Sequence, residues 1–220
     1  MKRLAVLTMI VALATAASAV FVDDFEAYPV GDPADFSATG NWTWNGQGSG
    51  ANASRIFYTW QNFGGQTLWI ASAANAAAGT GINSRPIAVA ADTDYIFSAA
   101  IVCETDNPAR TATAWVDLLV GQTLDTASSV IGGPLDIVAR GDGNDDIGIK
   151  GTYDDQMTII NFNSGTVGVD DMLFIRIAFT GTDATKPFVG IDNVSVVVPE
   201  PATLSILGLG GLALLRRRRA

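Results

Sequence analysis

The sequence predicts an all-β protein, a two-sheet jelly-roll β-sandwich, and three observations support this fold class. Short runs rich in β-branched and aromatic residues recur between residues 21 and 198, separated by clusters of Gly, Asn and Asp. None of these runs has the 3.6-residue apolar period of an amphipathic helix. Finally, many short strands in a single domain of roughly 180 residues are typical of sandwiches.

The predicted strands differ in how far they alternate between apolar and polar residues. Asp94–Val102 and Leu173–Thr180 are nearly continuous apolar runs, which is typical of central strands buried on both faces. Arg55–Trp60 and Ala112–Val120 come closer to alternation, so we expect one face of each to meet solvent. The other predicted strands are Phe21–Ala27, Asn41–Trp44, Gln66–Ser72, Arg85–Ala90, Leu135–Ala139, Met157–Phe162 and Phe188–Val198.

Residues 1–19 have the three parts of a secretory signal peptide. A basic start at Lys2 and Arg3 precedes the apolar run Leu4–Ala16, and Ala17 and Ala19 form a small-x-small cleavage site. We therefore expect an N-terminal signal helix, passage through the secretion machinery, and cleavage by signal peptidase after Ala19. The mature sandwich domain would then span residues 20–198.

Residues 199–220 combine three unlike elements in a fixed order. These are the tripeptide Pro199, Glu200, Pro201, the apolar run Ala202–Leu215, and the block Arg216, Arg217, Arg218, Arg219. The prolines hold the tripeptide extended, and the arginines stop a membrane segment on the cytoplasmic side. A short hydrophobic helix of 14 residues would be about 21 Å long, against a hydrocarbon core of roughly 30 Å. Such a helix suits a transient membrane anchor.

This order resembles the PEP-CTERM sorting signal of Gram-negative, biofilm-forming bacteria. The resemblance implies that an exosortase recognises and cuts the tail. It also implies that the protein is exported to the cell surface, the outer membrane or the extracellular matrix, after transient insertion in the inner membrane.

The charge and the residue types exclude several function classes. Of the 13 basic residues six lie in the terminal segments, and of the 22 acidic residues only Glu200 does, which leaves the domain a formal net charge of −14. Such a charge argues against nucleic acid as a partner. The chain has no histidine, which removes Ser-His-Asp and Cys-His catalysis. The prediction is a protein that is not an enzyme, although a paired-carboxylate glycosidase stays chemically open.

Four segments of the domain resemble jelly-roll carbohydrate-binding modules and related lectin-like sandwiches. They are Phe21–Gly31, Gly65–Trp69, Asp94–Ser98 and Gly190–Val196. The resemblance implies that the first and last strands lie together and that an acidic residue from each helps to hold a structural calcium ion. The matching positions are Glu26 and Asp192, with Asp24 as a third. Calcium needs six to eight oxygens, so backbone carbonyls would supply the rest. The alternative is that these carboxylates are solvated strand ends.

The tryptophans suggest a ligand surface. Four of the five lie between residues 42 and 69, and Trp42 and Trp44 share one strand face. Flat indoles suit sugar rings, yet large aromatics in a sandwich also form its core, so both interpretations stay open.

Taken together, the sequence predicts an exported, exosortase-processed surface or matrix protein whose domain is a structural or polysaccharide-associated binding module. The alternative is a glycan-active hydrolase or lyase on a lectin-like sandwich.

The signal peptide gives the first testable prediction. N-terminal sequencing of the native protein should begin at Val20, because the small-x-small site ends at Ala19. A mature chain that still begins at Met1 would contradict export.

Overall fold

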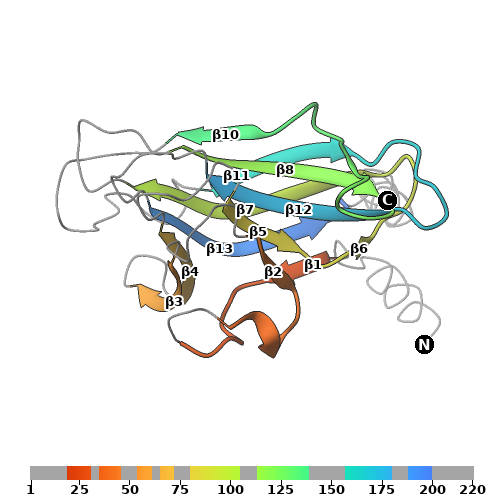
Figure 1. The fold of residues 1–220 in the computed structure, drawn as a ribbon. Helices are drawn as coiled ribbons and strands as arrows, with labels where there is room; N and C mark the ends of the chain where they lie inside the picture. Colours follow the sequence, from red (N-terminus) through yellow and green to blue (C-terminus); the bar gives the residue numbers. More distant parts are fainter. Residues whose placement is uncertain are drawn as a thin grey trace, which may run out of the picture.

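The structure is a computed structural model that describes residues 19–30, 35–45, 54–60, 65–71, 80–104, 113–138, 157–179 and 188–199. Within these residues all paired strands are antiparallel, and they form two sheets that stack face to face (Figure 1). We call the sheets A and B.

Sheet A contains six strands among the described residues, in the order β11-β7-β13-β4-β3, with β1 paired to β13. Their bounds are β1 Ala19–Asp23, β3 Ser54–Trp60, β4 Gly65–Ala71, β7 Asp94–Glu104, β11 Met157–Asn163 and β13 Phe188–Val197.

Sheet B contains seven strands in the same part of the chain, in the order β10-β8-β12-β5-β2, with β6 paired to β12 and β9 to β8. Their bounds are β2 Trp42–Asn45, β5 Thr80–Ser84, β6 Ile87–Ala88, β8 Thr113–Gly121, β9 Ser128–Ser129, β10 Leu135–Val138 and β12 Met172–Phe179. A single turn of 3-10 helix, η1, occupies Phe36–Ala38.

The predicted all-β, two-sheet fold is confirmed, and each predicted strand has a counterpart. The two apolar runs become β7 and β12, and each of these strands lies between two others in its sheet. The first strand is shorter than predicted: it ends at Asp23, because Phe25 adopts a positive φ of 58° and the chain turns. The predicted strand Arg85–Ala90 shrinks to β6, since Pro86 has no N–H for a ladder.

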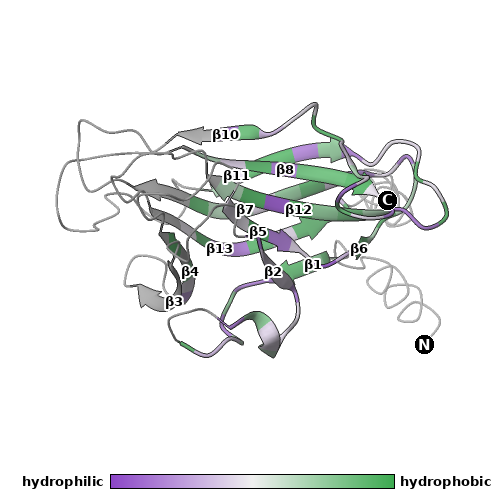
Figure 2. Ribbon diagram, in the orientation of Figure 1, coloured by the Kyte–Doolittle hydropathy of each residue, from purple (hydrophilic) through white to green (hydrophobic). Residues whose placement is uncertain are grey.

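The core lies between the sheets and follows the period of two along the central strands. In β12 the side chains of Leu173, Ile175 and Ile177 are fully buried against the other sheet. Figure 2 shows the same pattern, with apolar segments concentrated on β8, β12 and β13. Other buried residues in this cluster are Leu68, Ile70, Ile82, Phe97, Ala99, Val116, Leu118, Ile191, Val194 and Val196.

Several predictions fall on residues that the structure does not describe. These are the signal helix with Ala17, the hydrophobic C-terminal helix, and the tail residues Glu200, Pro201, Arg216, Arg217, Arg218 and Arg219. In the part of the chain that the structure describes, no helix reaches the length and apolarity that a membrane span requires.

The buried carboxylate of Asp23 fixes the chain where it leaves β1. Its Oδ1 accepts from the backbone N of Phe25 at 2.9 Å. Its Oδ2 accepts from Tyr28 Oη at 2.7 Å, Asn41 Nδ2 at 3.0 Å and Trp42 Nε1 at 2.9 Å. One carboxylate, only 6% exposed, thus joins the turn after β1 to the start of β2. Four donors offset the cost of burying its charge.

Replacing Asp23 by Ala should destabilise the domain by about 3–5 kcal/mol, because buried donors that lose their acceptor cost about 1–3 kcal/mol each. Urea unfolding of the full chain measures this change. Asp125 is exposed in the β8–β9 turn, and Asp125→Ala, the matched control, should change the free energy of unfolding by less than about 0.5 kcal/mol. Equal effects of the two substitutions would contradict the role given to Asp23.

Candidate functional site

The three predicted calcium ligands lie where the first and last strands meet. Strand β1 pairs antiparallel with β13, from Ala19 opposite Val197 to Asp23 opposite Val194, as the resemblance implied. Asp24 and Glu26 are exposed in the turn after β1, whereas Asp192 is only 2% exposed. Asp192 precedes an irregularity in the β13 register, and Asn193 there has a φ of 47°.

Each of these three carboxylates accepts a hydrogen bond from a backbone N–H. Asp24 Oδ1 accepts from the N of Glu26 at 3.2 Å, and Asp192 Oδ1 accepts from the N of Asn193 at 2.6 Å. Glu26 Oε1 accepts from the N of Gln66, at the start of β4, at 2.6 Å. The carboxylates therefore already anchor the backbone of this region.

The backbone oxygens that a calcium ion would need are also engaged. Gln66 Nε2 donates to the carbonyl oxygens of Phe25 at 3.0 Å and Tyr28 at 2.9 Å. Among the described residues, no three acidic, histidine or cysteine side chains gather as a metal site requires. Calcium binding by Asp24, Glu26 and Asp192 stays a prediction, and in this structure hydrogen bonds within the protein engage the oxygens that would hold the ion.

Burial raises the pKa of Asp192 to about 7, and the negative charges of Glu26, Asp24 and Asp23 add to this shift. The hydrogen bond from the backbone of Asn193 opposes it. This region of the domain is therefore strongly acidic around one buried carboxyl group.

Trp42 is buried rather than exposed, which corrects the prediction that it forms a sugar-stacking surface. It is 2% exposed, stacks on Phe25 with ring centroids 5.9 Å apart, and bonds Asp23. Trp44 shares its strand face, as predicted, and packs half-buried against the same core. The physical reason is that β2 turns this face toward sheet A, so period two places both indoles inside.

The outer face of sheet B carries a different set of polar and aromatic side chains. Buried alternate residues of β8, β12 and β5 point inward, so their neighbours point away from the core. Strand pairing aligns these neighbours in two rows. The first, which we call the polar row, is Asp117, Arg176, Asn83 and Thr43; the second, the tryptophan row, is Asp136, Trp115, Ala178, Gly81 and Asn45.

Two buried polar atoms of the polar row have no hydrogen-bond partner among the residues that the structure describes: Arg176 Nε and Asn83 Oδ1. Asn83 is 6% exposed, and Arg176 lies directly opposite it on β12. On the other side of Arg176, Asp117 is engaged by Ser129 Oγ, which donates to its Oδ1 at 2.6 Å. A free donor and a free acceptor therefore lie on adjacent strands.

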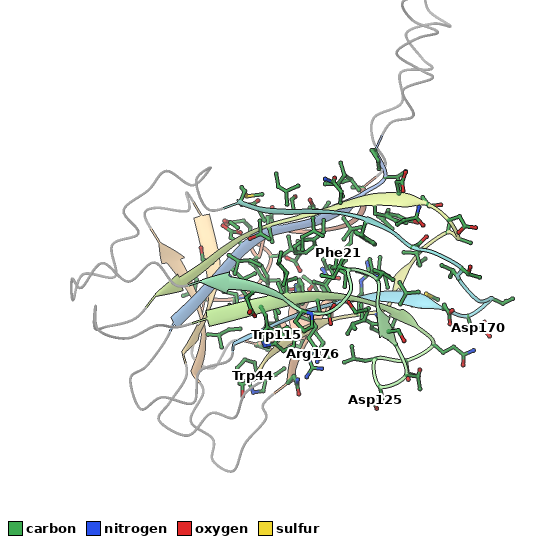
Figure 3. All side chains as sticks on the ribbon, turned by 90° about the horizontal axis from the view of Figure 1, so that it is seen from above. Phe21, Trp44, Trp115, Asp125, Asp170 and Arg176 are labelled. Carbon is green, nitrogen blue, oxygen red and sulfur yellow. The ribbon has the colours of Figure 1, made fainter. Side chains whose placement is uncertain are left out.

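The tryptophan row places one aromatic side chain beside small residues. The guanidinium of Arg176 lies over the half-buried Trp115 ring, 5.4 Å from its centroid (Figure 3). Beyond Ala178, the row continues with Gly81, where an added Cβ would lie 2.0 Å from the Ile177 carbonyl oxygen. Only glycine fits there, and both Gly81 and Ala178 are buried.

Sequence reasoning missed this face, although two signals could have found it. Trp115 and Asp117 alternate with the apolar Ala114, Val116 and Leu118, and Arg176 is the single charge in the apolar run of β12. A lone charge at the centre of a buried strand needs a polar partner. The alternation of apolar and polar residues predicts on which face of the sheet that charge lies.

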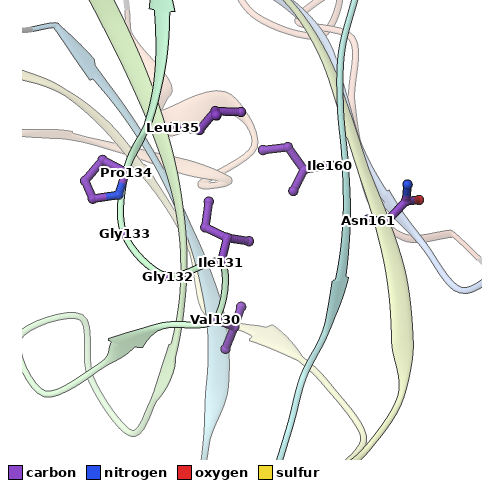
Figure 4. Close-up of a pocket in the computed structure, with 8 residues that line it drawn as sticks. All are labelled: Val130, Ile131, Gly132, Gly133, Pro134, Leu135, Ile160 and Asn161. Carbon is purple, nitrogen blue, oxygen red and sulfur yellow. The ribbon is translucent and has the colours of Figure 1, made fainter.

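A cavity of about 370 Å³ opens at the sheet edges between β10 and β11. Figure 4 shows Ile131, Leu135 and Ile160 pointing toward one another there. Its lining is mainly aliphatic, and Asn161 supplies the one polar side chain among the lining residues. It lacks the aromatic ring and the unpaired polar atoms of the outer face of sheet B.

The raised pKa of Asp192 predicts an unusual pH dependence of stability. The folded domain keeps a proton, with a pKa of about 7 against an ordinary value of 3.8, whereas the unfolded chain has released it. The stability contributed by Asp192 is therefore fully present below about pH 4 and is lost as the pH rises through 7, at up to about 1.4 kcal/mol per pH unit.

The comparison is with Asp192→Asn, which keeps the shape of the protonated acid and cannot titrate. Urea unfolding of both proteins between roughly pH 5 and pH 8 isolates the contribution of this one group. Wild-type stability should fall relative to the variant as the pH rises. Parallel curves would mean that Asp192 titrates normally.

Comparison with known proteins gives three results. The PEP-CTERM protein-sorting motif matches residues 197–219, which confirms the resemblance seen in the tail. Among curated proteins, none matches the sequence significantly.

Solved structures with a similar fold include carbohydrate-binding modules. The CBM22-2 xylan-binding domain of Paenibacillus barcinonensis Xyn10C aligns with a TM-score of 0.51 at 13% identity, over 82% of this chain and 99% of that domain. The CBM22-1 domain of the same protein gives 0.46 at 13% identity, over 86% and 99%. The CBM22-1–GH10 modules of Clostridium thermocellum xylanase 10B, complexed with xylohexaose, give 0.48 at 14%, over 83% of this chain and 29% of that one. The chain therefore carries a PEP-CTERM protein-sorting motif behind a β-sandwich with the fold of a carbohydrate-binding module.

Proposed function

We propose that this protein is exported, is cut by an exosortase, and binds an uncharged polysaccharide at the cell surface or in the extracellular matrix. The proposed binding surface is the outer face of sheet B, with Trp115, Arg176 and Asn83 as its main contacts. In this role the domain is a binding module rather than an enzyme.

The sorting motif and the terminal strands support the first part of the proposal. The motif begins at the end of β13, and Pro199 follows that strand by two residues. Strand β1 begins at Ala19, the predicted signal-peptidase site. Both predicted processing sites thus border paired strands, so removing both terminal segments would take only Ala19 from the strands of the sandwich. We assign exosortase recognition to Pro199, Glu200 and Pro201.

The observation that carries the binding proposal is the pair of unsatisfied atoms, Arg176 Nε and Asn83 Oδ1. A buried polar atom without a partner costs about 1–3 kcal/mol, and a ligand that supplies the missing bonds recovers this energy. A sugar hydroxyl donates one hydrogen bond and accepts others. One hydroxyl placed between β12 and β5 would satisfy both atoms.

Trp115 supplies the apolar contact that a sugar ring needs. Arg176 covers one face of the indole, and we propose that a sugar stacks against the other. From Trp115 the row runs across Ala178 and Gly81 to Asn45, which lies three strands from Trp115, and we propose that the sugar chain follows this row. That distance is about 14 Å at the usual strand spacing.

The surrounding charges favour an uncharged polymer. Asp117 and Asp136 lie directly opposite Arg176 and Trp115, and the whole chain carries a formal charge of −9. A uronate would meet this negative field, and its carboxylate could not donate to Asn83 Oδ1.

Affinity electrophoresis of the full chain in gels that contain neutral or uronate-rich polysaccharides tests the proposal. Trp115→Ala should weaken retention in the neutral gel by about tenfold or more, or roughly 1.4 kcal/mol. Asn83→Ala and Arg176→Lys should weaken it too, since each removes one of the two unpaired atoms.

Ile159→Ala is the matched control, because Ile159 is 63% exposed on β11 in the other sheet. It should leave retention unchanged, and circular dichroism should show that every variant is folded. Wild-type retention by the three sheet B variants would contradict the proposed surface. Release of reducing sugar by the wild-type protein would instead support the glycan-active enzyme.

A further inference from the structure

The turn after β1 is tied to β4 through Gln66. Gln66 is 6% exposed, and its amide nitrogen donates to two backbone carbonyls, those of Phe25 and Tyr28. Its own backbone N donates to Glu26 Oε1 at 2.6 Å. Three hydrogen bonds donated by one residue thus hold the turn against β4, which pairs with β13 as β1 does.

The geometry of these acceptors is what a hard cation would otherwise use. Two carbonyl oxygens converge on one point, and the carboxylate of Glu26 lies beside them. A primary amide has two N–H donors, and here each meets one carbonyl. The amide therefore satisfies the same oxygens without adding charge.

We propose that Gln66 replaces a structural calcium ion in this domain, so that the amide closes the β1 turn and the fold needs no metal. The acidic side chains here, Asp24, Glu26 and Asp192, anchor backbone N–H groups instead of a cation. The inference is independent of the proposed polysaccharide surface, which lies on the other sheet.

The same contacts predict how the closure of the β1 turn could be made dependent on a metal ion. Gln66→Glu removes both side-chain donors and adds a carboxylate between two carbonyls and Glu26, which is a set of oxygens suited to calcium. Gln66→Met keeps a similar size but offers neither donor nor charge. Comparing the two variants distinguishes the effect of losing the hydrogen bonds from the effect of gaining a cation site.

Thermal melting of the full chain, in detergent with either millimolar calcium or a chelator, tests the proposal. Wild type should melt at the same temperature in both conditions. Gln66→Met should melt several degrees lower in both. Gln66→Glu should melt lower still in chelator and recover with calcium, while magnesium recovers it less. Asn161→Asp, an added charge on exposed β11, should show no response to calcium.

Two results would overturn the proposal. Wild type that loses several degrees in chelator would mean that the three carboxylates hold a cation after all. Gln66→Met that melts like wild type would mean that the amide does not close the turn. If Gln66→Glu fails to fold, the wild-type and Gln66→Met melts alone still decide between these results.

Discussion

The hydrogen bonds of the buried Asp23 carboxylate are the interaction on which the rest of this sandwich depends. Strand β1 belongs to sheet A and β2 to sheet B, so the chain must cross between the layers between Asp23 and Trp42. A crossing of this kind leaves donors on both layers in an apolar interior. Asp23 accepts from four of them, so one charge fixes both the turn and the position of Trp42. The hydroxyl of Thr39 extends the network by donating to Tyr28.

The pairing of β1 with β13 places the first and last strands of the domain side by side. Strand β13 is paired with β1, β7 and β4, which makes it one of the most firmly held strands in the described part of the chain. The sorting motif starts at its last residue. A tail that leaves from a central strand can be cut without loosening the core, because the strand keeps its partners on both sides. Ala19, the predicted signal-peptidase site, lies opposite Val197 in the same ladder.

The periodicity of apolar residues and the positions of turn-forming residues predicted the fold well, because the apolar pattern follows directly from which residues are buried. The apolar runs of β7 and β12 and the alternation of β8 follow from which faces meet the core. Strand β5 was missed because Thr80–Ser84 has a single large apolar residue, Ile82, and depends on its neighbours for its place in sheet B. Strand β9, with only Ser128 and Ser129, has no local signal at all.

The candidate site was harder to predict because its chemistry depends on pairings far apart in the sequence. The Gly and Asn residues near Trp42 in the sequence suggest that it lies at the surface. Its indole N–H nevertheless donates a hydrogen bond to Asp23, nineteen residues earlier. Arg176 and Asn83 become neighbours only through the β12–β5 register. Gln66 belongs to no sequence motif, and its role depends on hydrogen bonds to two backbone carbonyls about forty residues earlier in the chain. The sorting motif at residues 197–219, in contrast, is a continuous stretch of sequence and could be recognised without any knowledge of the fold.

The central claim is that the outer face of sheet B binds sugar while the core tryptophans do not. The most direct measurement is the nuclear magnetic resonance of the indole N–H groups of the isotope-labelled full chain, titrated with a soluble oligosaccharide of a neutral polysaccharide that retains the protein. Substituting each tryptophan by Phe in turn assigns the signals. The account predicts that the Trp115 signal shifts with saturation while that of Trp42, bonded to Asp23 inside the core, does not. An unmoved Trp115 signal at saturating ligand would contradict it.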